Sequence, residues 1–295
     1  MKKFIYSAVA MAACAISLSA QAGGHYVPGV EGIQGSSVPP PGNYYLGYMV
    51  HYNIDSLRAP GSKNAIPGHN EGSVTALANR FVKITDKKIL GANYGFEAIV
   101  PVVHKSLTFN AAGISESHSG VADVYLGPLV LGWHGERWDA VAAAGLWLDN
   151  AKSKNASDPG NGYKSTMLTA GGTYYFDKAK TWSGSALMRY EINSKKDGFR
   201  PGNQATVEWG VGKVVGPVQL GIVGYSQMQT TKDSGVGASN AKAERHAIGA
   251  EVVYPLMKEA GLMLKAAYYK EVSAKGGTGP QPKGSTARFT LVKAF

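Results

Sequence analysis

Apolar and polar residues alternate along most of the chain from about residue 43 onward. In residues 181–193, for example, Trp182 and Met188 lie on one face, whereas Arg189 and Glu191 lie on the other. A period of two predicts β-strands with one apolar and one polar face. Twelve segments share this pattern: residues 43–55, 71–85, 88–103, 121–133, 138–150, 163–176, 181–193, 203–213, 217–230, 242–254, 261–272 and 285–295.

These strands are longer than those of most soluble proteins. They have 11 to 16 residues, whereas strands in soluble proteins usually have about five or six. A tilted strand needs about 9–11 residues to cross a bilayer. The length therefore favours strands that span a membrane, with lipid covering their apolar faces.

The links between the predicted strands alternate between short and long. Both ends of the strand series fall on the side of the short links. Outer-membrane barrels have this arrangement, with short periplasmic turns, long external loops and an even number of strands. We therefore expect an all-β fold, a transmembrane antiparallel up-and-down barrel of about twelve strands over residues 43–295, in the bacterial outer membrane. The short links are residues 86–88, 134–137, 177–180, 214–216 and 255–260, and the long links are residues 56–72, 106–120, 151–162, 194–202, 231–241 and 273–284.

The aromatic residues near the strand ends fit the same architecture. They resemble the girdles that barrels place at the two membrane interfaces. The last strand ends in a terminal aromatic residue, with Phe289, Leu291 and Phe295 on one face. This pattern resembles the assembly signal of outer-membrane barrels, so we expect the barrel assembly machinery to be a partner. The girdle residues on the predicted lipid face are Tyr44, Tyr48, Trp138, Phe176, Trp182 and Phe289.

Residues 1–22 are typical of a secretory signal peptide. Lys2 and Lys3 precede an apolar stretch from Phe4 to Ala15, and Ser19–Ala22 has the small residues that signal peptidase recognises. The apolar stretch is too short to span a membrane.

Residues 23–42 form a separate segment before the first strand. Eight Gly and Pro residues between Pro28 and Gly42 prevent a regular ladder here. The segment also contains Tyr26, Val30 and Ile33, which a solvated tail would not need. One hypothesis is that this periplasmic or lumenal segment folds into the barrel and plugs it; the alternative is a tail stiffened by prolines.

Composition and charge narrow the function classes further. The chain has 30 Lys and Arg against 20 Asp and Glu, a formal net charge of +10. In an exported protein, a basic surface is better suited to outer-membrane lipids and lipopolysaccharide than to nucleic acid. The single cysteine, Cys14, lies in the signal peptide, and the histidines are scattered without metal-ligand spacing. We therefore expect no cofactor and no metal.

Three segments resemble a known family. Val38–Tyr45 resembles the entry segment of the outer-membrane family named after the meta-pathway of phenol degradation. Ile89–Phe96 resembles the third strand of that family, and Gly120–Asp123 with Gly127–His134 is the best match. The resemblance implies an outer-membrane transporter of aromatic or other hydrophobic compounds, and it brings no catalytic residues.

The polar faces of the predicted strands supply candidates for a solute path. Charged side chains of opposite sign lie on neighbouring strands, together with aromatic and amide groups that can stack on an aromatic solute. The alternative is that these groups fill the lumen with ion pairs and have only a structural role. The predicted lumen residues are Tyr45, Met49, His51, Arg189, Glu191, Glu208, Tyr225, Gln227, Glu251, Lys265, Tyr269 and Glu271.

The sequence favours a channel for a small hydrophobic or aromatic compound, and not an enzyme. Twelve strands exceed the eight whose side chains fill a barrel and fall short of sixteen-stranded open porins, so the path should be narrow or plugged. Two alternatives stay open. One is a barrel-borne lipid hydrolase or acyltransferase, because His118 lies close to Ser119 and Asp123. The other is a structural or adhesive barrel.

Overall fold

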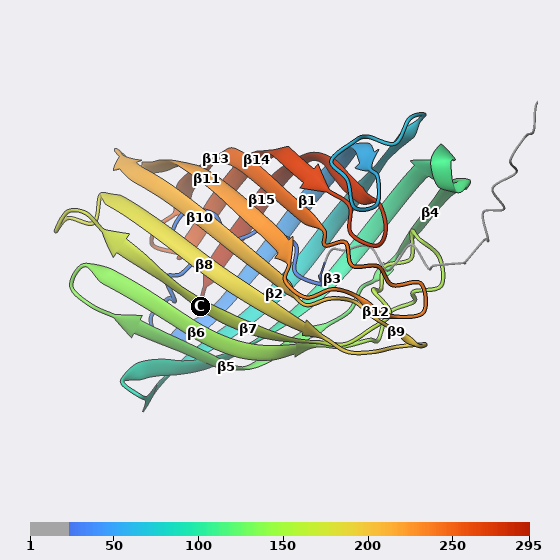
Figure 1. The fold of residues 1–295 in the computed structure, drawn as a ribbon. Helices are drawn as coiled ribbons and strands as arrows, with labels where there is room; N and C mark the ends of the chain where they lie inside the picture. Colours follow the sequence, from blue (N-terminus) through green and yellow to red (C-terminus); the bar gives the residue numbers. More distant parts are fainter. Residues whose placement is uncertain (1–23) are drawn as a thin grey trace, which may run out of the picture.

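The strands of the chain form a hydrogen-bond ladder that closes on itself (Figure 1). The computed structural model describes residues 24–295. Within them, β1 (Gly42–Arg58) pairs with β2 (Asn70–Ile89) on one side and with the last strand, β15 (Gln281–Ala294), on the other. All pairings are antiparallel, so the predicted all-β barrel is confirmed. The long strands between residue 135 and β15 are β6 (Trp138–Trp147), β7 (Ser165–Tyr175), β8 (Trp182–Asn193), β10 (Gln204–Val215), β11 (Val218–Gln229), β13 (Glu244–Met257) and β14 (Leu262–Lys275).

Two strands form consecutive parts of a single crossing. Both β4 (Ile114–Val121) and β5 (Tyr125–His134) pair with β3 (Ala92–Phe109), β4 with its second half and β5 with its first. The short strands β9 (Phe199–Arg200) and β12 (Ser234–Gly235) pair with each other and form a separate small sheet. Over residues 24–295 the wall therefore has twelve strands, as predicted.

Strand ends differ from the sequence prediction in two hairpins. The predicted link at residues 86–88 is part of β2, and the chain turns instead at Leu90 and Gly91, which have positive φ. The predicted long link at 106–120 is mostly a hairpin, in which β3 and β4 are joined by the short 3₁₀ helix η2 (Asn110–Ala112). Side chains of β4 alternate only between partly buried and exposed. Its residues are polar on both faces, so the apolar alternation that marks the other strands is missing here.

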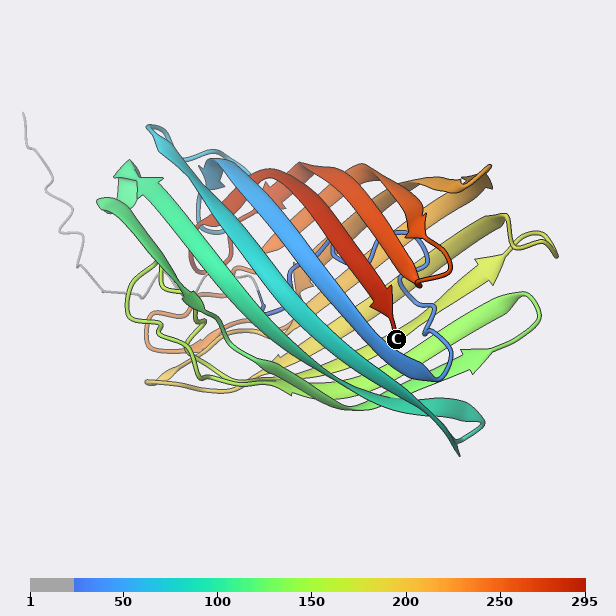
Figure 2. The same cartoon turned by 180° about the vertical axis from the view of Figure 1, so that it is seen from behind.

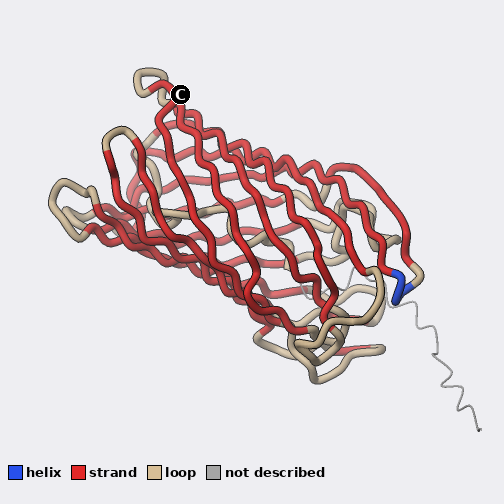
Figure 3. The backbone as a smooth tube through the Cα atoms, turned by 90° about the horizontal axis from the view of Figure 1, so that it is seen from above, coloured by secondary structure: helices blue, strands red, loops and turns tan. Residues whose placement is uncertain are grey.

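The two ends of the barrel are unequal. Figure 3 shows the short hairpin turns and the C-terminus at one end, and the longer loops with the helix at the other. We call these the short-turn end and the long-loop end. By the arrangement of outer-membrane barrels, they are the periplasmic and the external end. The predicted signal peptide lies outside the described residues.

The outer face of the barrel is apolar. Large side chains such as Ile222, Ile248 and Phe289 are about half exposed on it. Exposed apolar groups along a closed barrel form the band that lipid covers. Among residues 24–295, no helix is long and apolar enough to cross a membrane.

Candidate functional site

Residues 24–41 lie inside the barrel. Figure 1 and Figure 2 show this segment, in dark blue, within the ring of strands. Near the long-loop end, the His25 imidazole lies 3.3 Å from a carboxylate oxygen of Asp123. Near the short-turn end, Val38 packs against Ile84 and Val130. The segment therefore runs through much of the length of the lumen.

Three glutamates on one side of the barrel, on β8, β10 and β13, hold the backbone of the segment. Glu191 on β8 accepts N–H donors from His25, at 2.8 Å, and Tyr26, at 3.3 Å. Glu208 on β10 accepts the N–H of Glu31 at 3.1 Å and the hydroxyl of Tyr26. Glu251 on β13 accepts the N–H of Ile33. An irregular segment has no ladder of its own, and these carboxylates supply acceptors that its buried N–H groups need.

The side chain of Glu31 bridges two sides of the barrel. Its carboxylate pairs with Arg80 of β2, at 3.0 Å, and with Arg189 of β8. Its carbonyl accepts a hydrogen bond from Lys265 at 2.7 Å. Arg288 likewise donates to the carbonyl of Val30 and pairs with the Glu251 carboxylate. Unpaired charges are costly to bury, and each charged side chain named here has a partner of opposite sign.

Glycine residues allow the segment to approach the wall closely. Gly32 has a φ of +70°, and a Cβ added there would lie 1.9 Å from Glu251 Oε2. On the wall, a Cβ at Gly221 would lie 2.5 Å from Ile33 Cδ1, and one at Gly171 would lie 2.4 Å from Ser36 Oγ. Glycines on both partners therefore shape the contact.

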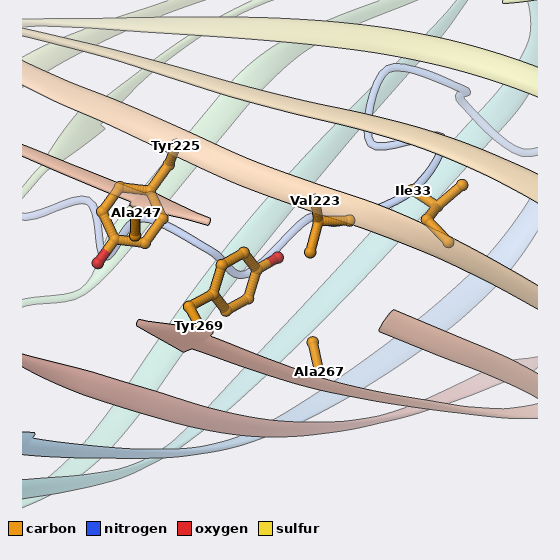
Figure 4. Close-up of a cluster of buried hydrophobic side chains, with 6 residues drawn as sticks. All are labelled: Ile33, Val223, Tyr225, Ala247, Ala267 and Tyr269. Carbon is orange, nitrogen blue, oxygen red and sulfur yellow. The ribbon is translucent and has the colours of Figure 1, made fainter. Parts of the chain in front are cut away.

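An apolar cluster anchors the middle of the segment. Figure 4 shows Ile33 next to Val223 of β11, with the rings of Tyr269 and Tyr225 on the other side of Val223. The two rings lie 5.7 Å apart, a separation at which aromatic pairs attract. The segment is thus held by apolar packing as well as by ion pairs.

Nine of the twelve predicted lumen residues are buried or partly buried on the inner face. They lie on β8, β10, β11, β13 and β14, where one face of each strand is polar and the other apolar. Each contacts the inserted segment or another member of the set, as Glu271 does by accepting the Tyr225 hydroxyl at 2.9 Å. Their role in a solute path stays a prediction. These residues are Arg189, Glu191, Glu208, Tyr225, Gln227, Glu251, Lys265, Tyr269 and Glu271.

The faces of β1 were predicted the wrong way round. Met49 is 55% exposed on the lipid side, Tyr45 packs against the exposed ring of Phe81, and His51 bonds to Thr75 on the outer face. The predicted girdle residues Tyr44 and Tyr48 instead face the lumen, where Tyr48 is 4% exposed. The prediction assumed that the more apolar face of a strand meets lipid. On β1 that face lines the lumen, because the lumen itself is apolar on this side.

Several important lumen residues were missed by the sequence analysis. Arg80, Glu97 and Arg288 lie on the inner face, and Glu31 lies in the inserted segment. A sequence signal existed for the first three, since each is a charged residue within a membrane-length alternating strand. No such signal was available for Glu31.

The segment lies mainly against the charged strands and leaves part of the opposite wall uncovered. Along β1, β2 and β3, small apolar side chains such as Val50, Val74 and Ala76 line the remaining space. This space consists of three chambers of about 180, 200 and 550 Å³. The first two share Val50, Val74 and Ala76, and the second and third share Tyr48, Arg80 and Arg189. The chambers therefore form a series along one apolar wall.

A polar cluster lies at the boundary between two of these chambers. Arg80 donates to the Tyr48 hydroxyl at 3.1 Å and to Glu97 at 2.6 Å, in addition to pairing with Glu31. Glu31 also pairs with Arg189. The cluster lies between the 200 Å³ and 550 Å³ chambers, and we call it the constriction.

Loop 151–164 covers the long-loop end of the lumen. Lys105 of β3 donates to the carbonyl of Asp158 at 2.7 Å, and Asp123 accepts the N–H of Asn161 at 2.7 Å. Burial tends to raise the pKa of Asp158, but N–H donors from Asn155 and Lys154 and the charge of Lys152 outweigh it, so this pKa lies below its usual value. The loop is therefore held by an ionised carboxylate.

The residues considered for an enzyme do not form a catalytic group. His118 contacts Ser157 and Asp158, whereas Ser119 bonds to His104 at 2.7 Å. Asp123 accepts backbone N–H groups from the covering loop. Within the described residues, no group of three His, Cys, Asp or Glu side chains could hold a metal ion.

Comparison with known proteins identifies the family. Residues 54–289 match the family described as "Putative MetA-pathway of phenol degradation". The chain belongs to this family. No curated protein sequence matches it significantly.

A solved outer-membrane channel shows the same fold as this member of the phenol-degradation family. The chain is similar to this channel, which is from Pseudomonas putida F1, with a TM-score of 0.76 and 15% identity over 92% of this chain and 100% of that chain. The fold is therefore that of an outer-membrane β-barrel. A lower similarity is found to the β-domain of the Bordetella autotransporter BrkA, with a TM-score of 0.48 and 13% identity over 86% and 99% of the two chains.

Two of the segments that resembled the family lie side by side in the wall. Ile89–Phe96 forms the β2–β3 turn and the start of β3, and Gly127–His134 forms most of β5. Trp133 Nε1 donates to the Leu90 carbonyl at 3.0 Å, and the Tyr94 hydroxyl donates to the Pro128 carbonyl at 2.9 Å. In this family member the motifs build one region of the barrel wall.

Proposed function

We propose that this family member is an outer-membrane channel for small hydrophobic or aromatic compounds. The observation that carries the proposal is the series of chambers along the apolar wall of β1, β2 and β3. An engineered protein cavity of about 150 Å³ with an apolar lining binds benzene, so the 200 Å³ chamber is large enough for a single aromatic ring. The family match, by its description, agrees with such a solute.

Uptake of a monoaromatic hydrocarbon by whole cells tests the proposal. Ala76 lines two chambers, so Ala76→Trp should fill the path and slow uptake to the rate of cells that lack the protein. Ala266→Trp is the matched control, because Ala266 pairs with the exposed Phe289 on the lipid face. Equal uptake with and without the protein would contradict the proposal.

We also propose that residues 24–41 act as the plug of this channel. The support is the position of the segment in the lumen and its bonds to Glu191, Glu208 and Glu251. Deleting residues 24–37 should raise single-channel conductance in planar bilayers, while heat-modifiable migration shows that the barrel still folds. A folded deletion variant with unchanged conductance would overturn this role.

The expected partners follow from the surface of the barrel. Phe289, Leu291 and Phe295 are exposed on the lipid side of the last strand and its end, and they are our candidates for the signal read by the barrel assembly machinery. Lysines of the long-loop end, such as Lys152 and Lys154, suit lipopolysaccharide phosphates. Replacing Phe295 by Ala should slow membrane assembly in cells; an unchanged assembly rate would remove this assignment.

A further inference from the structure

The 550 Å³ chamber has more positive than negative charge where it meets the constriction. Three cations line it there, namely Arg80, Arg189 and Lys265, against the two carboxylates of Glu31 and Glu97. All three cations contact Glu31: the two arginines pair with its carboxylate, and Lys265 donates to its carbonyl. The lining at this point therefore has an excess of one positive charge.

Charged groups behind the lining do not place a further carboxylate against the chamber. Glu251 lies 3.5 Å from Lys265, but it also pairs with the buried Arg288, so these two groups balance each other. Neither of them lines the chamber. Glu208 does not line it either, and its carboxylate accepts hydrogen-bond donors of the inserted segment. The positive excess therefore faces the chamber.

The guanidinium of Arg80 has hydrogen-bond donors left over. Its Nε donates to Glu97, and its Nη1 donates to Glu31 and to the Tyr48 hydroxyl. A guanidinium has five N–H donors, and the two on Nη2 have no acceptor within residues 24–295. The side chain is 16% exposed, and because it lines two chambers of the closed lumen, its exposed part borders the solute path.

The rest of the 550 Å³ chamber is largely apolar. Its volume exceeds the roughly 150 Å³ of an engineered cavity that holds benzene, so a benzene ring with a polar substituent fits. Ligand pockets commonly combine such an apolar body with a few polar groups that fix the orientation of the ligand. The apolar lining residues include Leu46, Val82, Ile84, Val130, Val141 and Val292.

We propose that the constriction is a binding site for aromatic carboxylates, with the carboxylate on Arg80 and the ring in the 550 Å³ chamber. The inference rests on the proposed channel function and names the class of solute that the path selects. Glu31 shows that this place holds a carboxylate, since its own carboxylate pairs with Arg80 and Arg189.

The chemistry of such a solute explains the use of a channel. An aromatic hydrocarbon dissolves in the bilayer without help, whereas a carboxylate is ionised at neutral pH and very costly to transfer into hydrocarbon. A path that supplies a cation beside an apolar chamber compensates for the loss of water around the carboxylate while it accommodates the ring. Lys258, in the exposed turn between β13 and β14, adds a cation to the lining of the same chamber.

Calorimetric titration of the purified protein in detergent tests the site. The two probes are benzoate and benzamide, which has nearly the same shape and no charge. Benzoate should bind at least about tenfold more tightly, because a hydrogen bond to a charged group contributes this much to binding. Heat-modifiable migration shows for every variant that the barrel is folded.

Two variants of Arg80 locate the site. Arg80→Lys keeps the charge, but the three donors of a lysine are taken up by Glu97, Glu31 and Tyr48, so none is left for a solute. Arg80→Gln combined with Glu97→Gln removes the guanidinium together with one of its partners and leaves the net charge unchanged. Both variants should lose the preference for benzoate.

A matched control removes an ion pair elsewhere in the lumen. Arg245 lies 3.6 Å from Glu271 and lines the 180 Å³ chamber, not the 550 Å³ chamber. Arg245→Gln combined with Glu271→Gln should therefore keep the preference for benzoate.

The outcomes separate this site from the channel function. A preference for benzoate that is present in the unchanged protein and the control, and lost in both Arg80 variants, supports the site. Equal binding of the two probes, binding of neither, or a preference that persists in folded Arg80→Lys would overturn it. Hydrocarbon uptake with Ala76→Trp decides the channel function separately, so the channel stands if that uptake slows and the titration fails.

Discussion

At the scale of single residues, the rule that apolar residues face lipid holds for one side of the barrel and fails for the other. It places Glu191 and Glu251 in the lumen correctly, since a charge facing lipid is strongly unfavourable. It fails for Tyr45, Met49 and Tyr48, because the more apolar face of β1 lines an apolar part of the lumen. Where the lumen wall is apolar, the lumen face and the lipid face of a strand no longer differ in polarity, and the prediction depends on that difference.

Gly32 provides a residue-level prediction about the inserted segment. Gly32→Ala introduces a Cβ that collides with the Glu251 carboxylate, and it also costs about 1–2 kcal/mol for an L-residue in a left-handed conformation. The segment should leave its site more often, so the channel should show more frequent open events in planar bilayers. Gly216→Ala is the control, since it has a φ of +59° but no atom near its Cβ. Identical gating in the two variants would contradict the close contact between Gly32 and Glu251.

At the scale of elements, strand number and alternation could be read from the sequence, whereas strand ends and loop contacts could not. The twelve crossings follow from period-two patterns of membrane length, which local residues determine. The hairpin of β3 and β4 was missed because Ser115, Ser117 and Ser119 make its polar strand look like a loop. The position of residues 24–41 depends on contacts with strands far away in the sequence, such as that of His25 with Glu191, and no local pattern encodes them.

The lipid face of β11 gives a prediction about strand register. Ile222 is 57% exposed on this face, whereas Gln219 bonds to Ser183 on the inner side. Ile222→Lys should destabilise the folded barrel by about 2–4 kcal/mol, the cost of a cation facing the middle of the bilayer. Gln219→Lys should have a much smaller effect. Denaturant unfolding in lipid vesicles measures both, and equal losses would show that the faces of β11 are wrongly assigned.

The covering loop gives a prediction about pH. The pKa of Asp158 is lowered in the folded protein, so its stabilising effect is present above the ordinary Asp pKa and is lost as pH falls through the folded value. Asp158→Asn should loosen loop 151–164 at neutral pH. Trypsin should then cleave after Lys152 or Lys154 faster than in the unchanged protein. The same cleavage rate in both proteins would contradict this role of the carboxylate.

At the scale of the whole molecule, the two sides of the lumen have different roles. The charged strands β8, β10 and β13 bind the inserted segment through three glutamates. The apolar strands β1, β2 and β3 keep a series of chambers beside it. Ion pairs and hydrogen bonds thus hold the segment on one side, while most side chains of the wall opposite are apolar outside the constriction.

A crystal of the protein exposed to bromobenzene tests this division most directly. The bromine atom gives an anomalous signal that locates the solute without assumptions about its path. We predict bromine peaks in the 200 Å³ chamber, against Val74 and Ala76, and in the 550 Å³ chamber beyond the constriction. Peaks confined to the lipid face, with both chambers empty of bromine, would contradict a solute path along the apolar wall.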